Sequence, residues 1–264
     1  MLGFLRGAWN YRHFIVSSIK AEFRNRFVRS RLGGLWMIIH PLVQVLIFAF
    51  ILSSLMAARM PGIQSRYAYA IYLMAGTLAW SLFSDIIQRC LTIFIDNGNL
   101  LKKMVFPRIC LPLIVTGSAV IANLLLLITI TMVFACLGHF PGVSLFALPL
   151  VFLLNIALAL GLGLTMGVLN VFIRDIGQAI PIFLQVGYWF TPIVYLPEII
   201  PQPYRRWLSL NPLYSLVEAY HDILVFGKMP VFGSLLPIAL ISMVMLALAL
   251  YLFRRSNAEM VDVL

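Results

Sequence analysis

The residues that could do chemistry are few and dispersed along the chain. The four histidines do not cluster, and the three cysteines have no C-x-x-C spacing, so neither a metal site nor a redox pair is expected. The sequence lacks a G-x-x-x-x-G-K-S/T phosphate loop, an H-E-x-x-H pair and a G-x-S-x-G nucleophile elbow. We therefore expect no enzymatic activity, nucleotide hydrolysis, cofactor or metal in this chain itself.

Asp85 and Arg89 are opposite charges four residues apart, which places them on one face of a helix. An ionisable residue inside a membrane span suggests a functional site by default. An internal ion pair near the membrane interface explains these two residues more simply, and we expect that pair. With so few acidic residues in apolar segments, an ion-coupled carrier is disfavoured.

These residues belong to a chain that is far more apolar than a soluble domain. Of its 264 residues, 62% are hydrophobic and 11% are charged, whereas a soluble domain is about half apolar and about a quarter charged. A helix needs about 20 apolar residues to cross a bilayer, and the runs here lack the alternation of barrel strands. The sequence therefore predicts an all-α integral membrane protein, one domain over residues 1–264, with six transmembrane helices near residues 37–57, 68–91, 110–137, 144–172, 177–196 and 231–253.

The net charge of +10 is explained by membrane topology. Lys and Arg are retained on the cytoplasmic side of short loops. With the N-terminus inside, 14 of the 19 Lys and Arg residues fall in predicted inner segments. We therefore expect both termini in the cytoplasm and a multi-pass protein of the bacterial inner (plasma) membrane. This placement removes nucleic acid as the explanation for the basic charge.

The basic N-terminus, residues 1–31, is predicted to be an amphipathic helix at the cytoplasmic interface, against membrane lipids. Apolar side chains recur every three or four residues at Phe4, Ala8, Tyr11, Ile15 and Ile19. Polar side chains occupy the other face at Arg6, Asn10, His13, Ser17, Lys20 and Arg24. This helix is either a passive anchor or a docking surface for a cytoplasmic partner.

Three further segments have predicted roles. Residues 197–228 are too apolar for a free loop and too rich in proline for a span, so we expect two short re-entrant helices in the outer leaflet, the second beginning at Asn211-Pro212. Residues 96–108 form a cytoplasmic loop with a short helix before Pro107. Gly163-x-x-x-Gly167 is a close-packing motif, predicted to act within the chain.

Motifs in a consistent order resemble the permease subunits of ABC type 2 polysaccharide exporters, which export O-antigen, capsule or teichoic acid chains. The first is Arg31-Leu32-Gly33-Gly34-Leu35-Trp36 followed by His40-Pro41-Leu42. The others are Leu101 to Arg108, Ile173-Arg174-Asp175-Ile176, Phe190-Thr191-Pro192-Ile193 and Asn211-Pro212-Leu213. The resemblance covers nearly the whole chain, and its alternative within the superfamily is an exporter of drugs or small lipids.

The resemblance implies a channel made of two copies of this chain, with two copies of a separate cytoplasmic ATPase that binds ATP and Mg²⁺. The substrate would be a lipid-linked polysaccharide of the O-antigen type. The surfaces that couple to the ATPase would include Leu100, Leu101, Lys102, Lys103, Phe106, Arg108, Arg174 and Asp175.

Aromatic side chains offer flat apolar faces with polar tips that suit sugar rings. We predict that some of Tyr72, Tyr188, Trp189 and Tyr195 line the glycan path, the alternative being an interfacial aromatic belt. Cations at the inner gate would face a lipid diphosphate, and the candidates are Arg29, Arg31 and Lys102. Their alternative role is the topology signal already described.

Overall fold

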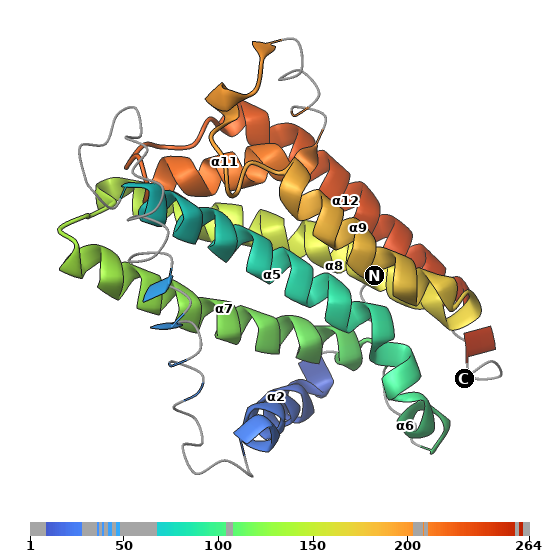
Figure 1. Ribbon diagram of the computed structural model, residues 1–264. Coiled ribbons are helices and arrows are strands. Elements are labelled where there is room, and N and C mark those ends of the chain that lie inside the picture. The colour runs from blue at the N-terminus through green and yellow to red at the C-terminus, as the bar shows by residue number, and fades with distance from the viewer. Residues whose placement is uncertain are drawn as a thin grey trace.

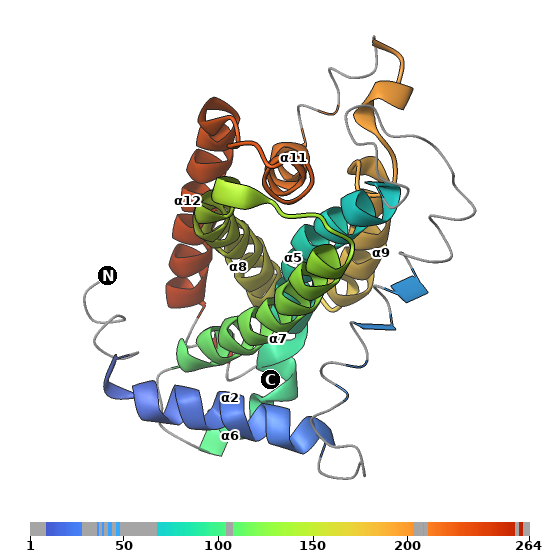
Figure 2. The ribbon, with the colours of Figure 1, turned by 90° about the vertical axis from the view of Figure 1, so that its left-hand side faces the viewer.

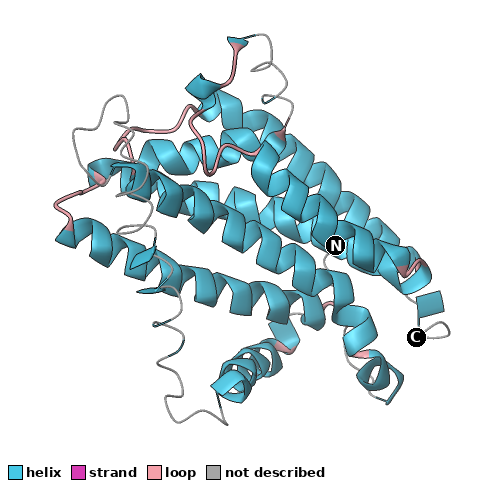
Figure 3. Cartoon of the chain, viewed as in Figure 1, coloured by secondary structure: helices cyan, strands magenta, loops and turns pink. Residues whose placement is uncertain are grey.

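The computed structural model describes residues 9–27, 68–103, 108–202 and 211–256, with isolated positions at 36–47, 208 and 259–260. Within these ranges the regular structure is entirely helical (Figures 1 and 3). The elements in chain order are α2 (Arg12–Phe27), α5 (Ala68–Asp96), α6 (Gly98–Lys103), α7 (Cys110–Cys136), η3 (Gly142–Ala147), α8 (Leu148–Phe172), α9 (Asp175–Phe190), η4 (Pro197–Ile199), α11 (Pro212–Leu224) and α12 (Phe232–Arg255).

Four segments are long and apolar enough to cross a membrane, namely Ala68–Asp96, Cys110–Cys136, Gly142–Phe172 and Phe232–Arg255. They confirm the predicted helices at 68–91, 110–137, 144–172 and 231–253. The predicted span at 37–57 lies almost wholly outside the described residues. Six spans, the orientation and the re-entrant placement therefore stay predictions.

The fifth predicted span is shorter than the hydropathy suggests. Instead of continuing to residue 196, α9 ends at Phe190, and Thr191 adopts extended backbone with φ −102° and ψ 133°. The cause is Pro192, because a proline disfavours helical backbone in the residue before it. With 16 residues, α9 is about 24 Å long at 1.5 Å per residue.

The centre of the fold is α5, which packs most extensively against α8 and also contacts α7, α9 and α11. Small residues on α8 allow this close approach. A Cβ atom at Gly167 would lie 2.2 Å from the carbonyl oxygen of Cys90, and one at Gly163 would lie 3.0 Å from the Cβ of Cys90. On another face, a Cβ at Gly161 would lie 2.9 Å from the backbone of Met245 in α12. The predicted intrachain role of the glycine motif is confirmed.

Three buried asparagines hold neighbouring helices to the backbone of α5. Each donates its side-chain amide to a main-chain carbonyl, an arrangement that satisfies a polar group inside an apolar bundle. The pairs are Asn123 to Leu78 at 3.1 Å, Asn155 to Ala79 at 2.9 Å and Asn170 to Leu91 at 2.8 Å. Two helices, α7 and α8, are therefore fixed to α5 along much of its length.

The short elements divide between the two ends of the bundle. Figure 2 shows α2 and α6 at one end and α11 at the other. Because α5 ends next to α6 and Asn170 of α8 bonds to Leu91 of α5, the turn after α8 lies at the α6 end too. The segments that were predicted to face the cytoplasm therefore lie together.

Candidate coupling and transport surfaces

A helix is observed within the predicted N-terminal segment as α2, which packs across the end of α7, and its place at the membrane interface stays a prediction. Ile15 and Ile19 are partly buried as expected, and a Cβ at Gly117 of α7 would lie 2.6 Å from Cδ1 of Ile19. Lys20 and Arg24 face outward. Tyr11 was predicted on the apolar face but is exposed, as are Phe14 and Val16 within α2. The other parts of 1–31, including Phe4 and Ala8, lie outside the described residues.

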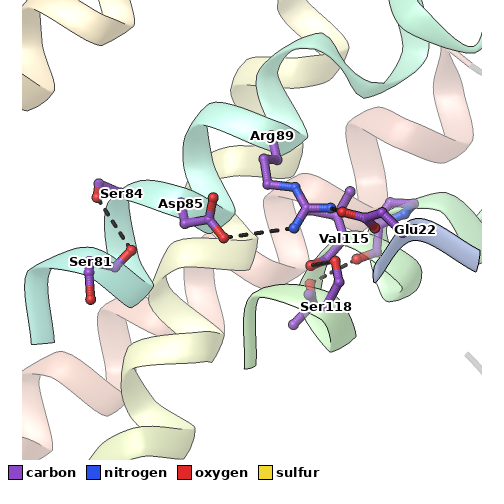
Figure 4. Close-up of polar contacts among 9 residues, drawn as sticks. Glu22, Ser81, Ser84, Asp85, Arg89, Val115 and Ser118 are labelled. Atoms are coloured by element: carbon purple, nitrogen blue, oxygen red, sulfur yellow. Dashed lines mark hydrogen bonds and ion pairs between the residues drawn. The ribbon is translucent and has the colours of Figure 1, made fainter. Parts of the chain in front are cut away.

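Arg89 joins α2 to α5 through two acidic side chains (Figure 4). Its Nη2 donates to Oε1 of Glu22 at 2.5 Å, and its Nη1 lies 3.7 Å from Oδ2 of Asp85. The predicted Asp85–Arg89 pair is confirmed. The closer partner, Glu22, was missed because it is 67 residues away and no sequence pattern connects the two.

A cavity of about 470 Å³ lies beside this ion pair. Its walls come from α2, α5 and α7, and they include Phe14, Glu22, Arg89 and Asp96. The side of α2 that faces the bundle therefore contacts α7 closely at Ile19 and borders this cavity at Phe14 and Glu22. Glu22 and Arg89 provide a specific connection across this loosely packed interface.

The short helix α6 was predicted before Pro107 and is observed. Leu101 is buried and Lys102 is exposed, so this turn faces both the bundle and the outside. Leu100 and Lys103 belong to α6, but their side chains are outside the described set, as is Phe106.

The turn between α8 and α9 presents Arg174 and Asp175, both exposed. It is positioned by tight packing, because a Cβ at Gly177 would lie 2.8 Å from Oδ1 of Asn170. Arg108 is partly buried just before α7. The candidate coupling residues that the structure describes therefore gather at the end of the bundle that carries α2 and α6. Of the candidate gate cations, Arg29 and Arg31 lie outside the described residues.

At the opposite end, Tyr72 is buried and its hydroxyl is engaged by the protein itself. The hydroxyl donates to the carbonyl of Pro192 at 3.0 Å and lies 3.2 Å from that of Tyr195. The ring stacks on His221 with centroids 3.7 Å apart, and His221 bonds through Nε2 to the carbonyl of Tyr72 at 3.1 Å. Sequence reasoning assigned no role to His221, which is 149 residues away.

The other aromatic candidates differ in exposure. Tyr188 is partly buried and packs edge-on against Trp80, with centroids 5.6 Å apart. Trp189 is 60% exposed, and Tyr195 is partly buried. Of the four predicted path residues, Trp189 has the most open ring. The structure brings Tyr72 and Tyr195 together, and it places the ring of Trp189 edge-on to that of Tyr188 with centroids 5.8 Å apart.

The second predicted outer helix begins at the expected residue. Asn211 caps α11 by accepting from the backbone N–H of Leu213 at 3.0 Å, and Pro212 occupies the first turn. The side-chain amide of Asn211 also donates to the hydroxyl of Thr191 at 3.0 Å. This bond fixes the start of α11 to the end of α9.

These surfaces all fall within a segment that matches a known family. A family model described as ABC-2 type transporter matches residues 14–225, from α2 to the end of α11. The chain belongs to this family. It is therefore a multi-pass transporter subunit, and the surfaces at the α2 end and the α11 end are those of an ABC-2 transmembrane domain.

Similar proteins with assigned names cover nearly the same length. An O-antigen export system permease protein RfbA of Myxococcus xanthus is 26% identical over 99% of both chains. A second protein of that name, from Klebsiella pneumoniae, is 27% identical over 81% of each chain. The polysialic acid transport protein KpsM of Escherichia coli is 28% identical over 90% of this chain and 92% of its own length.

Proposed function

We propose that this chain is the transmembrane, channel-forming subunit of an ATP-driven exporter that moves a lipid-linked, O-antigen-like polysaccharide from the cytoplasm across the inner membrane. The observation that carries the proposal is the end-to-end similarity to a permease named for O-antigen export, over 99% of both chains. Similarity to a polysialic acid transport protein supports a glycan substrate. None of these three relatives has a name that favours drugs or small lipids.

The working complex would contain two copies of this chain and two copies of a cytoplasmic ATPase. ATP and Mg²⁺ would bind to the ATPase, and α2, α6 and the Arg174–Asp175 turn would receive its movement. The grouping of these elements at one end supports this arrangement (Figure 2). ATP can shift the transporter between states only if it binds one arrangement of the ATPase pair better than the other.

The glycan would pass along aromatic side chains near the outer end. Trp189 is the best supported of these, because its ring is open to a ligand. Tyr188 would contribute an edge, while Tyr72 and Tyr195 would position the segment after α9. Lys102, with Arg29 and Arg31, would face the anionic lipid diphosphate at the inner gate.

Reconstitution with the cognate ATPase tests the proposal. Lipid-linked glycan should cross the membrane of proteoliposomes only when both proteins and ATP are present. Transport of a small amphipathic drug without glycan transport would overturn the proposal in favour of the alternative exporter.

Charge reversal tests the coupling surface separately. Arg174→Glu should reduce co-purification with the ATPase and ATP-dependent export. Lys228→Glu makes the same charge change at an exposed residue near the other end of the bundle and should change neither. Equal effects of the two variants would contradict the assignment of this turn.

A further inference from the structure

The cavity beside the Glu22–Arg89 ion pair lies at the ends of two long apolar helices. Its walls include Asp96 and Asn97, where α5 ends, and Leu111, near the start of α7. Both helices are long and apolar enough to cross a membrane, and the ends of such helices lie at the level of the lipid headgroups. The cavity volume of about 470 Å³ is within the range of about 300–1,000 Å³ that is usual for small-ligand sites.

Three polar side chains that line this cavity have no partner among the described residues. The hydroxyls of Ser18 in α2 and Thr92 in α5 make no hydrogen bond there, and Asp96 makes no ion pair. Several hydroxyls in the other helices instead bond to their own backbone, as those of Thr116 and Thr165 do at 2.8 Å. A ligand with matching polar groups would therefore gain hydrogen bonds at all three positions.

The charges in the cavity favour an amine over an additional anion. Its charged walls are Glu22, Asp96 and Arg89, so acids outnumber cations by two to one. The guanidinium of Arg89 is already engaged by Glu22 and lies 3.7 Å from Oδ2 of Asp85 (Figure 4). Pockets that select anionic lipids are basic. A lipid diphosphate or a purely anionic headgroup would therefore be repelled by the carboxylates of this cavity.

The cavity also has a polarity that runs along α5. Arg89, Thr92 and Asp96 follow one another at intervals of three and four residues, which places them on one side of the helix. The cation and the acid are about 10 Å apart along the helix axis. Asp96 is the last residue of α5, so the acid lies toward water and the cation lies deeper. A zwitterionic phospholipid has the matching order, because its ammonium group lies outside its phosphate.

An apolar strip on α7 continues from the cavity toward the middle of the bundle. Ile114 lines the cavity, and Ile121 and Ile128 follow at intervals of seven residues, which places all three on one side of α7. Ile121 and Ile128 are 40% and 56% exposed. A polar cavity that adjoins an exposed apolar strip has the same arrangement as a phospholipid, with its headgroup and its acyl chains.

We propose that this cavity binds the headgroup of a bilayer phospholipid that carries a primary amine, as in phosphatidylethanolamine. The ammonium group donates to the carboxylate of Asp96 in a charge-assisted bond. The adjoining phosphate accepts from the hydroxyls of Ser18 and Thr92, and the acyl chains lie along the α7 strip. The lipid would then join α2 to α5 and α7 beside the Glu22–Arg89 pair. This ligand is distinct from the transported glycan, so the site goes beyond the proposed function.

Lipid retention by the purified transporter tests the headgroup. The complex with its ATPase, in detergent, would be given equal amounts of phosphatidylethanolamine, phosphatidylcholine and phosphatidylglycerol. Bound lipid would be measured by native mass spectrometry. We expect phosphatidylethanolamine to be retained at least fivefold more than either of the others, because only its headgroup combines a positive charge with N–H donors. Equal retention of phosphatidylcholine or phosphatidylglycerol would overturn the proposal.

A matched pair of variants tests the site within the same measurement. Asp96→Asn removes the acid with little change of size and should lower retention of phosphatidylethanolamine at least fivefold. Glu259→Gln neutralises an exposed acid beyond the end of α12 and should leave retention within twofold of the unsubstituted protein. Unchanged retention in Asp96→Asn, or equal losses in the two variants, would overturn the assignment of Asp96.

Cysteine protection locates the lipid in the folded membrane protein. Ser18→Cys and Lys20→Cys would each be made in a Cys136→Ala background, because Cys90 and Cys110 are buried. A membrane-impermeant maleimide would be applied in nanodiscs of phosphatidylglycerol with and without phosphatidylethanolamine. The amine lipid should slow the reaction at Ser18→Cys at least fivefold and leave the exposed Lys20→Cys unchanged.

Equal rates at Ser18→Cys in the two kinds of nanodisc would overturn the proposal. Equal slowing of both cysteines would also overturn it, because that result would reflect the membrane surface rather than the cavity. This measurement needs no transport, so its outcome is independent of which substrate the complex exports.

Discussion

The ion pair between Glu22 and Arg89 should hold α2 onto the bundle, and replacing Glu22 by Gln tests this with little change of shape. At about 4 Å and an effective dielectric constant of about 20, a pair of unit charges attracts by about 4 kcal/mol. The side chains of Arg89 and Glu22 are 20% and 26% exposed, so solvent screening reduces this gain. We expect a net contribution of about 1–2 kcal/mol to the docking of α2.

A loss of about 1.4 kcal/mol corresponds to a tenfold change in an equilibrium constant. Amide hydrogen exchange in α2, measured by mass spectrometry on the transporter in nanodiscs, should therefore become about tenfold faster in Glu22→Gln. Lys20→Gln removes a charge from the exposed side of the same helix and should leave exchange within twofold of the unsubstituted protein. An unchanged rate in Glu22→Gln, or equal acceleration in both variants, would refute the reasoning.

Substitutions of Arg89 and of its second acidic partner, Asp85, test the same interaction. Arg89→Gln should loosen α2 by a similar amount, and adding Glu22→Gln should then have little further effect, because the interaction is already absent. Asp85→Asn should have a weaker effect, since Asp85 lies 3.7 Å from the guanidinium and is 42% exposed. An additive double variant would show that the two side chains act independently.

Three further predictions concern packing and transport. Gly167→Ala should destabilise the protein by about 1–3 kcal/mol, because the new Cβ meets the carbonyl oxygen of Cys90. Gly233→Ala is the control, since its Cβ would enter open space. Equal thermal midpoints of the two variants would contradict this prediction. Tyr72→Phe removes a donor from the Pro192 carbonyl and should cost about 1–2 kcal/mol in thermal unfolding. Trp189→Ala should lower glycan export without lowering the thermal midpoint, and normal export would exclude the ring from the path.

The long helices could be predicted from sequence because hydropathy is a local property. Four spans agree with runs of apolar residues, and α11 begins at Pro212, where an N-cap asparagine precedes a proline. The expected ion pair of Asp85 with Arg89 is also local, since it depends only on helical spacing. Each of these predictions needed only residues within one segment.

The remaining features depend on which helices meet. Glu22 is paired with Arg89, and His221 with Tyr72, through contacts between distant parts of the chain. Hydropathy averaged over α5 also hides the polar residues Ser84, Asp85 and Gln88, because the large number of buried apolar residues dominates the mean. The early end of α9 is a different case, since Pro192 was visible in the sequence but the apolar run continued past it.

The attachment of α5 along its whole length affects how movement could cross the membrane. It contains 29 residues, none of them proline, and would measure about 43 Å. Arg89 connects it to α2 near one end, while the hydroxyls of Tyr69 and Tyr72 bond to the backbone of residues 192–195 at the other. Because Asn123, Asn155 and Asn170 hold its flanks, α5 behaves as a stiff rod. In the proposed complex, a tilt applied at the α2 end of α5 would therefore displace residues 192–195 at the other end in the same stroke, without passing through a flexible hinge.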